Sequence, residues 1–558
     1  MKRILFCIIL SGFTLVGCKD WLDINYSPNN ATVDNVPFQL FLPQTMTRTA
    51  ARQINNSDMF FLSHHLTKSG SVGGAFNFLT GLIQAQDGNG WWQDYYQINS
   101  NLKLILEKAI EREIKSFEGI AMTLMAYNFH KLVDLYGNIP YTEALMGAVL
   151  YQPAYDKAED VYANLLTEID KAIATLNAAK STEQIAKSNA VQLNTNDIMA
   201  KGDIDKWIRF AHSIKLRMLM RLSGVQNVNS QVAAIMNNCL RYDEVMFCNP
   251  GYQKESGKMN PFYSTFGYNQ TDSELQAHQF YRPTRDFVDM LRDNKDPRLR
   301  VYIQPRQVIG ADPQKMADYA KWGLLDEYYI GIPYGQQNPP ENAYTTAICI
   351  GILGLSSSMT TGPVSNAPVL AGFETQFFLA EAALKGIIPG GDAAAKTYYE
   401  TGVKGVFRYL DVPLRATFTF PGYPATYPGT KPPITGTWEQ AANEYLAQNN
   451  PFCNWSLMTT TAQKMEAIAT QKWISLFGVD AIESWNEFRR LDLPLLGAAL
   501  MGQEPKNIST LHYPQTETNL NEVNVNAAGA QDRTNNVYNY RMFWDKENPI
   551  VGRVSNYL

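Results

Sequence analysis

The stretch Glu118–Pro140, EGIAMTLMAYNFHKLVDLYGNIP, sets the pattern on which the fold of this chain is built. We predict a helix from Glu118 to Leu135. Gly137 is the residue type that commonly follows a helix, and Pro140 prevents the helix from resuming because proline has no backbone N–H to donate. A second helix is predicted immediately before it, from Trp91 to about Lys115. Two helices separated by a few residues form a hairpin.

Three further pairs of predicted helices follow the same pattern. In Ala158–Leu176, apolar residues recur three and four positions apart on one face. In the last pair, Asp480 can cap the second helix, with Glu483 three residues on as in a capping box. A helix pair buries only one side by itself, so the pairs must stack. We therefore predict a mostly α-helical protein with four stacked, tetratricopeptide-like hairpins at about residues 98–136, 158–222, 373–410 and 462–494.

Two long insertions, at about 243–372 and 411–460, interrupt the helix pairs and are predicted to be irregular. They are rich in Gly, Pro and aromatic residues. Long ordered loops in a compact protein usually carry function, so we expect the helices to be scaffold and the insertions to be the working face. A ring face packs well against the C–H face of a sugar or against a peptide side chain. The candidate ligand contacts, each of which has core packing as its alternative, are Phe76, Phe78, Tyr263, Phe266, Tyr268, Trp322 and Tyr328.

The N-terminal residues are predicted to be a lipoprotein signal peptide, 1–17. Lys2 and Arg3 precede an apolar run from Ile4 to Val16, which is too short to cross a bilayer. Cys18 follows Leu-Val-Gly, the pattern of a lipobox, so we expect its thiol to be acylated and the mature chain to begin there. The alternative is an ordinary secretory signal with a chance cysteine. Residues 18–45 would then form the anchor and tether, followed by a single domain, 46–558.

Composition narrows the class of function. The net charge is −5 and no Lys/Arg run reverses it, so we exclude nucleic-acid binding. The chain contains no motif typical of zinc, nucleotide or nucleophilic catalysis, and adjacent residues such as His64 and His65 point about 100° apart on a helix. We predict no catalytic residues, no cofactor beyond the lipid on Cys18 and no metal site, although a structural calcium ion is left open. Cys239 and Cys248 are as consistent with a disulfide as with buried free thiols.

Charged residues in the last helix pair are predicted to be structural. Glu483 and Glu487 lie one helical turn apart, as do Arg217 and Arg221 in an earlier helix. Apolar residues flank the charges of the last helix, and burial of that helix would force its charges into ion pairs. We therefore expect a buried ion network that ties the last helix to its neighbours.

Several motifs resemble the SusD/RagB family of Bacteroidetes outer-membrane nutrient-binding lipoproteins, and its SusD-like branch most. These are the lipobox, Leu135–Tyr141, Phe378–Ala382, Gln471–Trp473 and Glu483–Arg490. The resemblance implies a surface-exposed lipoprotein that sits on a TonB-dependent outer-membrane channel and captures oligosaccharide without cleaving it. Peptide capture, a helical adaptor without a small ligand, and a surface glycosidase are the alternatives.

Overall fold

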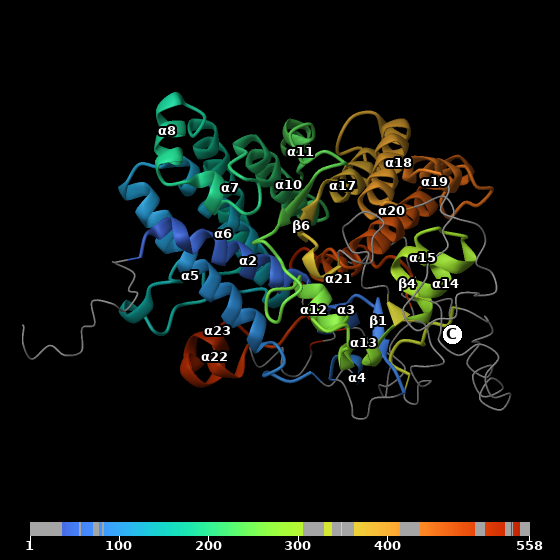
Figure 1. Ribbon diagram of the computed structural model, residues 1–558, viewed down its shortest axis with the longest axis horizontal. Coiled ribbons are helices and arrows are strands. Elements are labelled where there is room, and N and C mark those ends of the chain that lie inside the picture. The colour runs from blue at the N-terminus through green and yellow to red at the C-terminus, as the bar shows by residue number, and fades with distance from the viewer. Residues whose placement is uncertain are drawn as a thin grey trace, which may run out of the picture.

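The computed structural model describes residues 36–54, 57–70, 77–80, 83–304, 329–336, 347–348, 362–412, 436–496, 508–529, 537 and 540–546 of the 558-residue chain. Within these ranges the protein is mostly α-helical, as predicted (Figure 1). None of the helices described is long and apolar enough to cross a bilayer.

All four predicted helix pairs are present. Gly137 ends the second helix with a positive φ of 71°, a conformation that favours glycine. Asp480 caps the last helix by accepting a hydrogen bond from the Glu483 N–H at 3.0 Å. The eight helices are α5 (Asn89–Glu111), α6 (Lys115–Tyr136), α7 (Ala158–Ala178), α10 (Ile204–Leu222), α17 (Gly372–Leu384), α18 (Gly391–Leu410), α20 (Thr461–Leu476) and α21 (Ala481–Leu491).

The pairs stack in chain order. α5 contacts α6, α6 contacts α7, α7 contacts α10 and α10 contacts α17, which packs on α18 and α20; α20 in turn contacts α21. Figure 1 shows this series crossing the molecule from α7 on one side to α18 on the other. Stacking lets each hairpin bury the apolar face that it would expose alone.

Glycines allow two of these contacts to be close. A Cβ at Gly119 of α6 would lie 2.7 Å from Leu176 Cγ of α7, and one at Gly405 of α18 would lie 2.8 Å from Phe373 Cβ of α17. Both separations are below any normal carbon contact, so a larger residue would push the helices apart.

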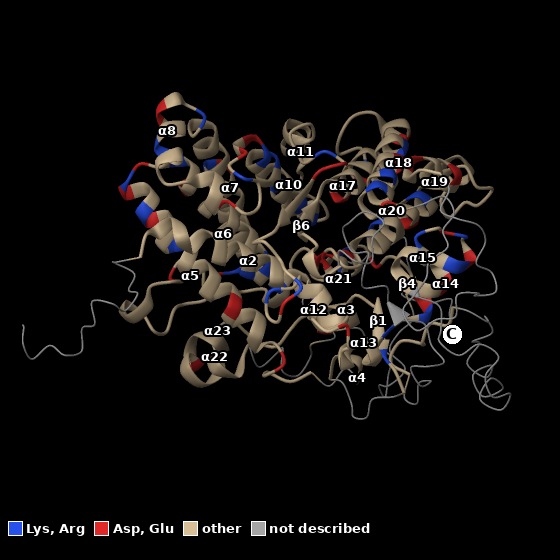
Figure 2. Cartoon of the chain, viewed as in Figure 1, with Lys and Arg blue, Asp and Glu red and all other residues tan. Residues whose placement is uncertain are grey.

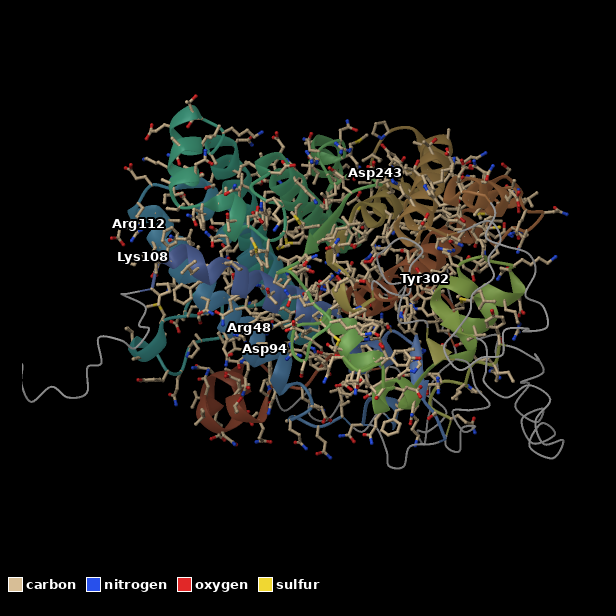
Figure 3. The ribbon with its side chains drawn as sticks, in the orientation of Figure 1. Arg48, Asp94, Lys108, Arg112, Asp243 and Tyr302 are labelled. Carbon is tan, nitrogen blue, oxygen red and sulfur yellow. The ribbon has the colours of Figure 1, made fainter. Side chains whose placement is uncertain are left out.

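A helix precedes the first pair, within the range assigned to the tether. The predicted tether reached residue 45, but η2 (Phe38–Leu40) and α2 (Phe41–Ile54) begin earlier. Leu42 is fully buried, so this segment belongs to the core. Arg48 of α2 binds Asp94 of α5 at 3.0 Å, and Figure 3 shows the two side chains together.

Two predictions of secondary structure need correction. The sequence of residues 57–69 predicts a short helix, but only α3 (Ser57–Leu62) forms, because the chain then enters strand β1 (Leu66–Lys68). Residues 181–203, which connect the two helices of the second pair, contain α8 (Thr182–Ala190) and α9 (Leu193–Asn196). Neither insertion is wholly irregular. The described part of the first contains α12 (Pro261–Phe266), α13 (Gln276–Phe280), α14 (Arg285–Asp293) and α15 (Leu299–Tyr302), and that of the second contains α19 (Trp438–Leu446).

The remaining elements are short. β1 pairs antiparallel with β3 (Tyr281–Pro283), β2 (Val245–Cys248) with β6 (Ala367–Ala371), and β4 (Ile303–Gln304) with β5 (Ala347–Ile348). β6 leads directly into α17, so its pairing with β2 closes the first insertion against the stack. The other helices are α4 (Asn77–Thr80), α11 (Asn229–Ile235), α19 (Trp438–Leu446), α22 (Gln515–Leu520) and α23 (Glu522–Ala527), with 3-10 turns η3 (Gly147–Val149), η5 (Gly362–Val364) and η6 (Trp455–Leu457).

Candidate functional site

The predicted ion network is present at the centre of the helix stack. The Arg221 guanidinium of α10 lies 3.1 Å from Asp134 of α6, 2.7 Å from Glu483 of α21 and 2.5 Å from Glu487 of α21. Arg221, Asp134 and Glu483 have no exposed side-chain surface. One arginine therefore joins three helices that are far apart in the sequence.

A second set of pairs extends this network. Arg217 donates two hydrogen bonds to the carboxylate of Glu374 in α17, at 2.9 and 2.8 Å. Arg490 binds both Glu381 at 2.5 Å and Glu487 at 2.7 Å. Burial opposes ionisation of Glu487, but Arg490 and Lys472 outweigh it and hold the pKa of that carboxyl well below its usual range. The structural interpretation of these charges is confirmed, because they neutralise one another inside the core.

One group within the network has the composition of a metal site. A ligand atom from each of His130, Asp134 and Glu483 lies within 4.8 Å of the others, and all three residues are buried. Arg221 already pairs with both carboxylates, and burial together with nearby Arg217 holds the pKa of His130 well below its usual value. Arg221 thus already neutralises the two carboxylates of this group.

His64 and His65 also serve packing. The His64 ring stacks on Tyr334 with centroids 3.9 Å apart, and the His65 ring stacks on Trp473 at 4.4 Å. Burial lowers the pKa of His65 to about 3, although its ring nitrogen lies 3.0 Å from the Trp473 carbonyl oxygen. His65 is therefore neutral at physiological pH.

The described cysteines are buried free thiols. Cys239 and Cys248, for which the sequence left a disulfide open, do not pair with each other, and Cys453 is also free. Burial raises the pKa of the Cys239 thiol and of the Cys248 thiol to about 12. These groups are unreactive at neutral pH because the thiolate is the reactive form.

The predicted aromatic contacts divide into three groups. Phe266 is fully buried against Phe60, and Phe78 is 6% exposed with its ring 6.0 Å from Trp91, so both rings pack in the core. Tyr263 is also buried, at 7% exposure. Tyr268 is half-buried. Phe76, Trp322, Tyr328 and the lipidation candidate Cys18 lie outside the described residues.

The residues around Tyr268 form a small polar cluster after α12. Its ring lies 6.4 Å from that of Tyr263 and 5.3 Å from that of His278. Asn269 holds the following turn by accepting hydrogen bonds from the backbone at 271 and 273, each at 2.9 Å. Glu274 lies 2.6 Å from His278, and this contact lowers the pKa of the carboxyl. The structure therefore brings together two of the predicted residues, Tyr263 and Tyr268.

A cleft that the sequence did not reveal lies between α14 and α20; we call it the α14–α20 cleft. Its volume is about 520 Å³, within the usual range for small-ligand sites. Its lining combines apolar side chains with carboxylates, an amide and a hydroxyl. The lining residues are Asp286, Asp289, Met290, Asp293, Asn294, Phe452, Glu466, Thr470 and Leu495.

The electrostatics of the α14–α20 cleft are acidic. Burial raises the pKa of Asp289 to about 6, against the opposing effect of Arg292, whose guanidinium lies 2.9 Å away. Burial also raises the pKa of Glu466. Asn450 donates to Asn294 at 2.8 Å and so fixes one amide at the rim. The cleft can offer several hydrogen-bond acceptors and one aromatic ring to a ligand.

One signal for this cleft was present in the sequence. Asp286, Asp289 and Asp293 are spaced three and four residues apart, so they lie on one side of a helix. Phe452 and Glu466 come from segments more than 150 residues later, and no local pattern links them to α14.

A second groove, of about 690 Å³, lies beside α7 and the end of α10. Glu159, Tyr162 and Asp170 line one wall, and Phe543 and Lys546 line another. Its rim is mixed in charge.

The comparison with protein families and the comparison with solved structures agree with each other. A family described as starch-binding and associating with the outer membrane matches residues 29–514. No curated protein sequence matches the chain. Among solved structures, a SusD homologue from Bacteroides fragilis is 21% identical, with a TM-score of 0.67, 92% of this chain covered and 100% of that one.

Two more solved structures show the same likeness. A SusD/RagB family protein from Bacteroides thetaiotaomicron is 17% identical, with a TM-score of 0.69, covering 92% of this chain and 100% of that one. A chitin-binding SusD homologue from Flavobacterium johnsoniae is 20% identical, with a TM-score of 0.66, covering 92% and 99%. At these identities the likeness shows a shared fold.

Proposed function

The chain belongs to the SusD-like family of starch-binding proteins that associate with the outer membrane, and on that basis we propose that it captures a glycan without cleaving it and passes it to a TonB-dependent channel. The observation that carries the proposal is the family match over residues 29–514, together with a helix stack that also supports a chitin-binding homologue. Without the family match, the structure alone would show only a helical scaffold with two grooves.

The α14–α20 cleft supports capture of a small ligand. Phe452 supplies a ring face on which a sugar can stack, while Asp293, Asn294 and Thr470 can bond its hydroxyl groups. The carboxylates would repel uronic acids and sulfated sugars. We therefore favour a neutral oligosaccharide, such as a fragment of starch or chitin.

Peptide capture is the second candidate, and the same cleft favours it. A cluster of carboxylates beside Met290 and Leu495 also suits a peptide with a Lys or Arg side chain. The aromatic residues Phe76, Trp322 and Tyr328, which lie outside the described ranges, remain candidate contacts for either ligand. An adaptor without any small ligand is the third candidate.

The anchor and the channel complete the proposal. The lipobox at Cys18 supports acylation of the mature N-terminus and attachment to the outer membrane, with the protein at the cell surface. Labelling cells with palmitate should mark the wild-type protein and leave Cys18→Ala unmarked. Secretion of unlabelled wild-type protein into the medium would refute the anchor.

Ligand capture is tested by calorimetry with starch, chitin and basic-peptide fragments. We expect one class to bind, and Phe452→Ala to weaken that binding about tenfold, the usual loss when a buried aromatic anchor is truncated. Tyr398, a half-buried aromatic residue outside the cleft lining, provides the control variant Tyr398→Ala, which should bind as the wild type does.

The outcomes separate the three candidates. Binding of an oligosaccharide supports glycan capture, and binding of the basic peptide alone replaces it with peptide capture. If no fragment binds, the adaptor function replaces both. Binding that is equally strong in wild type and Phe452→Ala removes the α14–α20 cleft as the site.

A further inference from the structure

Large apolar side chains are exposed together on one side of the protein. Val149, Tyr151, Leu520 and Val523 are 81%, 79%, 70% and 81% exposed, and Met146 is 43% exposed. Met146, Val149 and Tyr151 come from the loop around η3, whereas Leu520 comes from α22 and Val523 from α23. We call these five residues the α22–α23 face.

Hydrogen bonds join the two segments that form this face. Gln152 donates to the Leu520 carbonyl at 2.8 Å, and Asn524 donates back to the Gln152 carbonyl at 3.0 Å. Asn521 donates to the Pro153 carbonyl at 2.9 Å, and the Tyr155 hydroxyl donates to Glu517 at 2.8 Å. Segments separated by more than 350 residues thus form one surface.

Buried and partly buried neighbouring side chains attach the α22–α23 face to the core. Val525 is fully buried, and Leu145 and Tyr155 pack against the core from partly buried positions. Gly147 has a φ of +57°, which lets the loop turn tightly and direct Val149 outward. Exposure of these residues is therefore not a consequence of a poorly packed segment. Several large apolar side chains exposed on joined, well-packed segments are typical of an interaction site.

The charges around the face indicate what covers it. Residues 141–156 and 515–529 contain four carboxylates, at Glu143, Asp156, Glu517 and Glu522, and no Lys or Arg. Figure 2 shows red and no blue on α22 and α23. Lys103 of α5 reaches the edge, where it donates to the Leu145 carbonyl at 3.0 Å.

This acidic rim opposes two of the three obvious occupants. A second copy of the chain would place like charges opposite each other. A lipid surface would place the carboxylates against phosphate groups, whereas membrane-binding surfaces carry Lys and Arg. The remaining occupant is a different protein with an apolar centre and basic residues around it.

We propose that the α22–α23 face is the docking surface for such a protein, and that this protein is the channel of the proposed function. The inference rests on that function for the identity of the partner. The apolar residues supply the buried centre of the contact, and Glu143 and Glu522 orient the partner through its basic rim.

The test measures binding of the mature, acylated chain in detergent to a TonB-dependent transporter purified from the same outer membrane. Val149→Asp and Val523→Asp together should weaken binding at least about tenfold, because each places a charge in the buried centre. Glu522→Lys should weaken it severalfold, and more at low salt. Ile185→Asp is the matched control, since Ile185 on α8 is 50% exposed but remote from the face, and it should bind normally.

Failure of the docking surface and failure of the proposed function give different results in this test. If the transporter binds the double variant as tightly as wild type, the docking surface is refuted while the proposed function stands. Wild-type protein that binds a ligand but not the transporter also refutes it. Loss of self-association, or of binding to anionic phospholipid vesicles, in the double variant would replace the proposed partner with a second copy or a membrane. Wild-type protein that binds neither ligand nor transporter would instead refute the proposed function.

Discussion

Replacing Arg221 by methionine should lower the free energy of unfolding by about 3–5 kcal/mol, the usual cost of removing one partner from a buried ion pair. Methionine fills much of the same space, so the loss reports charge more than volume. The change leaves Asp134, Glu483 and Glu487 buried with fewer cations.

The magnitude follows from the geometry. At an effective dielectric constant of about 20, a unit charge pair separated by the 2.7 Å between Arg221 and Glu483 is worth roughly 6 kcal/mol before desolvation is subtracted. Each carboxylate keeps another partner: Tyr162 and Asn486 bond Asp134, Arg217 lies 3.6 Å from Glu483, and Arg490 binds Glu487. The expected loss in the free energy of unfolding is therefore closer to the cost of one uncompensated buried charge than to the cost of three.

Urea unfolding followed by tryptophan fluorescence provides the measurement. Arg48→Met is the matched control, because Arg48 pairs with Asp94 at 3.0 Å but both side chains are about one-third exposed (Figure 3). It should cost less than about 1 kcal/mol. Adding Glu483→Gln to Arg221→Met should recover part of the loss. If Arg221→Met costs no more than Arg48→Met, the network does not hold the stack together.

Three further predictions concern stability and reactivity. The pKa of His65 is about 3 in the folded protein and 6.5 in the unfolded chain, so the stability that neutral His65 contributes is lost as the pH falls below 6.5. Between pH 8 and pH 5 this loss is about 2 kcal/mol. His65→Gln should therefore reduce the fall in the free energy of unfolding over that range by the same amount. Gly119→Ala should destabilise by about 1–3 kcal/mol through contact with Leu176, despite alanine's better helix propensity, and an unchanged unfolding midpoint would contradict this. Cys239 and Cys248 should react with a disulfide reagent at pH 8 only after unfolding, whereas rapid labelling of the native protein would show that they are accessible.

Local patterns determined most of the helical framework. The Gly137–Pro140 stop and the three- and four-residue spacing in Ala158–Leu176 placed helices within a few residues of their observed ends. The errors arose where tertiary contacts overruled local composition. The chain from Leu66 pairs with β3 more than 200 residues away, so the helix expected to reach residue 69 stops at Leu62.

The candidate site was less accessible to sequence reasoning. An aromatic residue in an insertion can face a ligand or pack the insertion onto the scaffold, and its neighbours in sequence do not decide which. Phe266 proved to be core because Phe60, two hundred residues earlier, covers it. Tyr268, only two residues later, is half-buried beside a polar turn.

The sequence by itself determined the helix pairs, the apolar faces that make them stack and the charges that the last pair must bury, because these depend on residues within a few turns of one another. Only the tertiary structure decided which charges meet, where the α14–α20 cleft opens and that two distant segments form the α22–α23 face. Those features join side chains separated by 87 to 368 residues, and such distances in sequence leave no periodic signal.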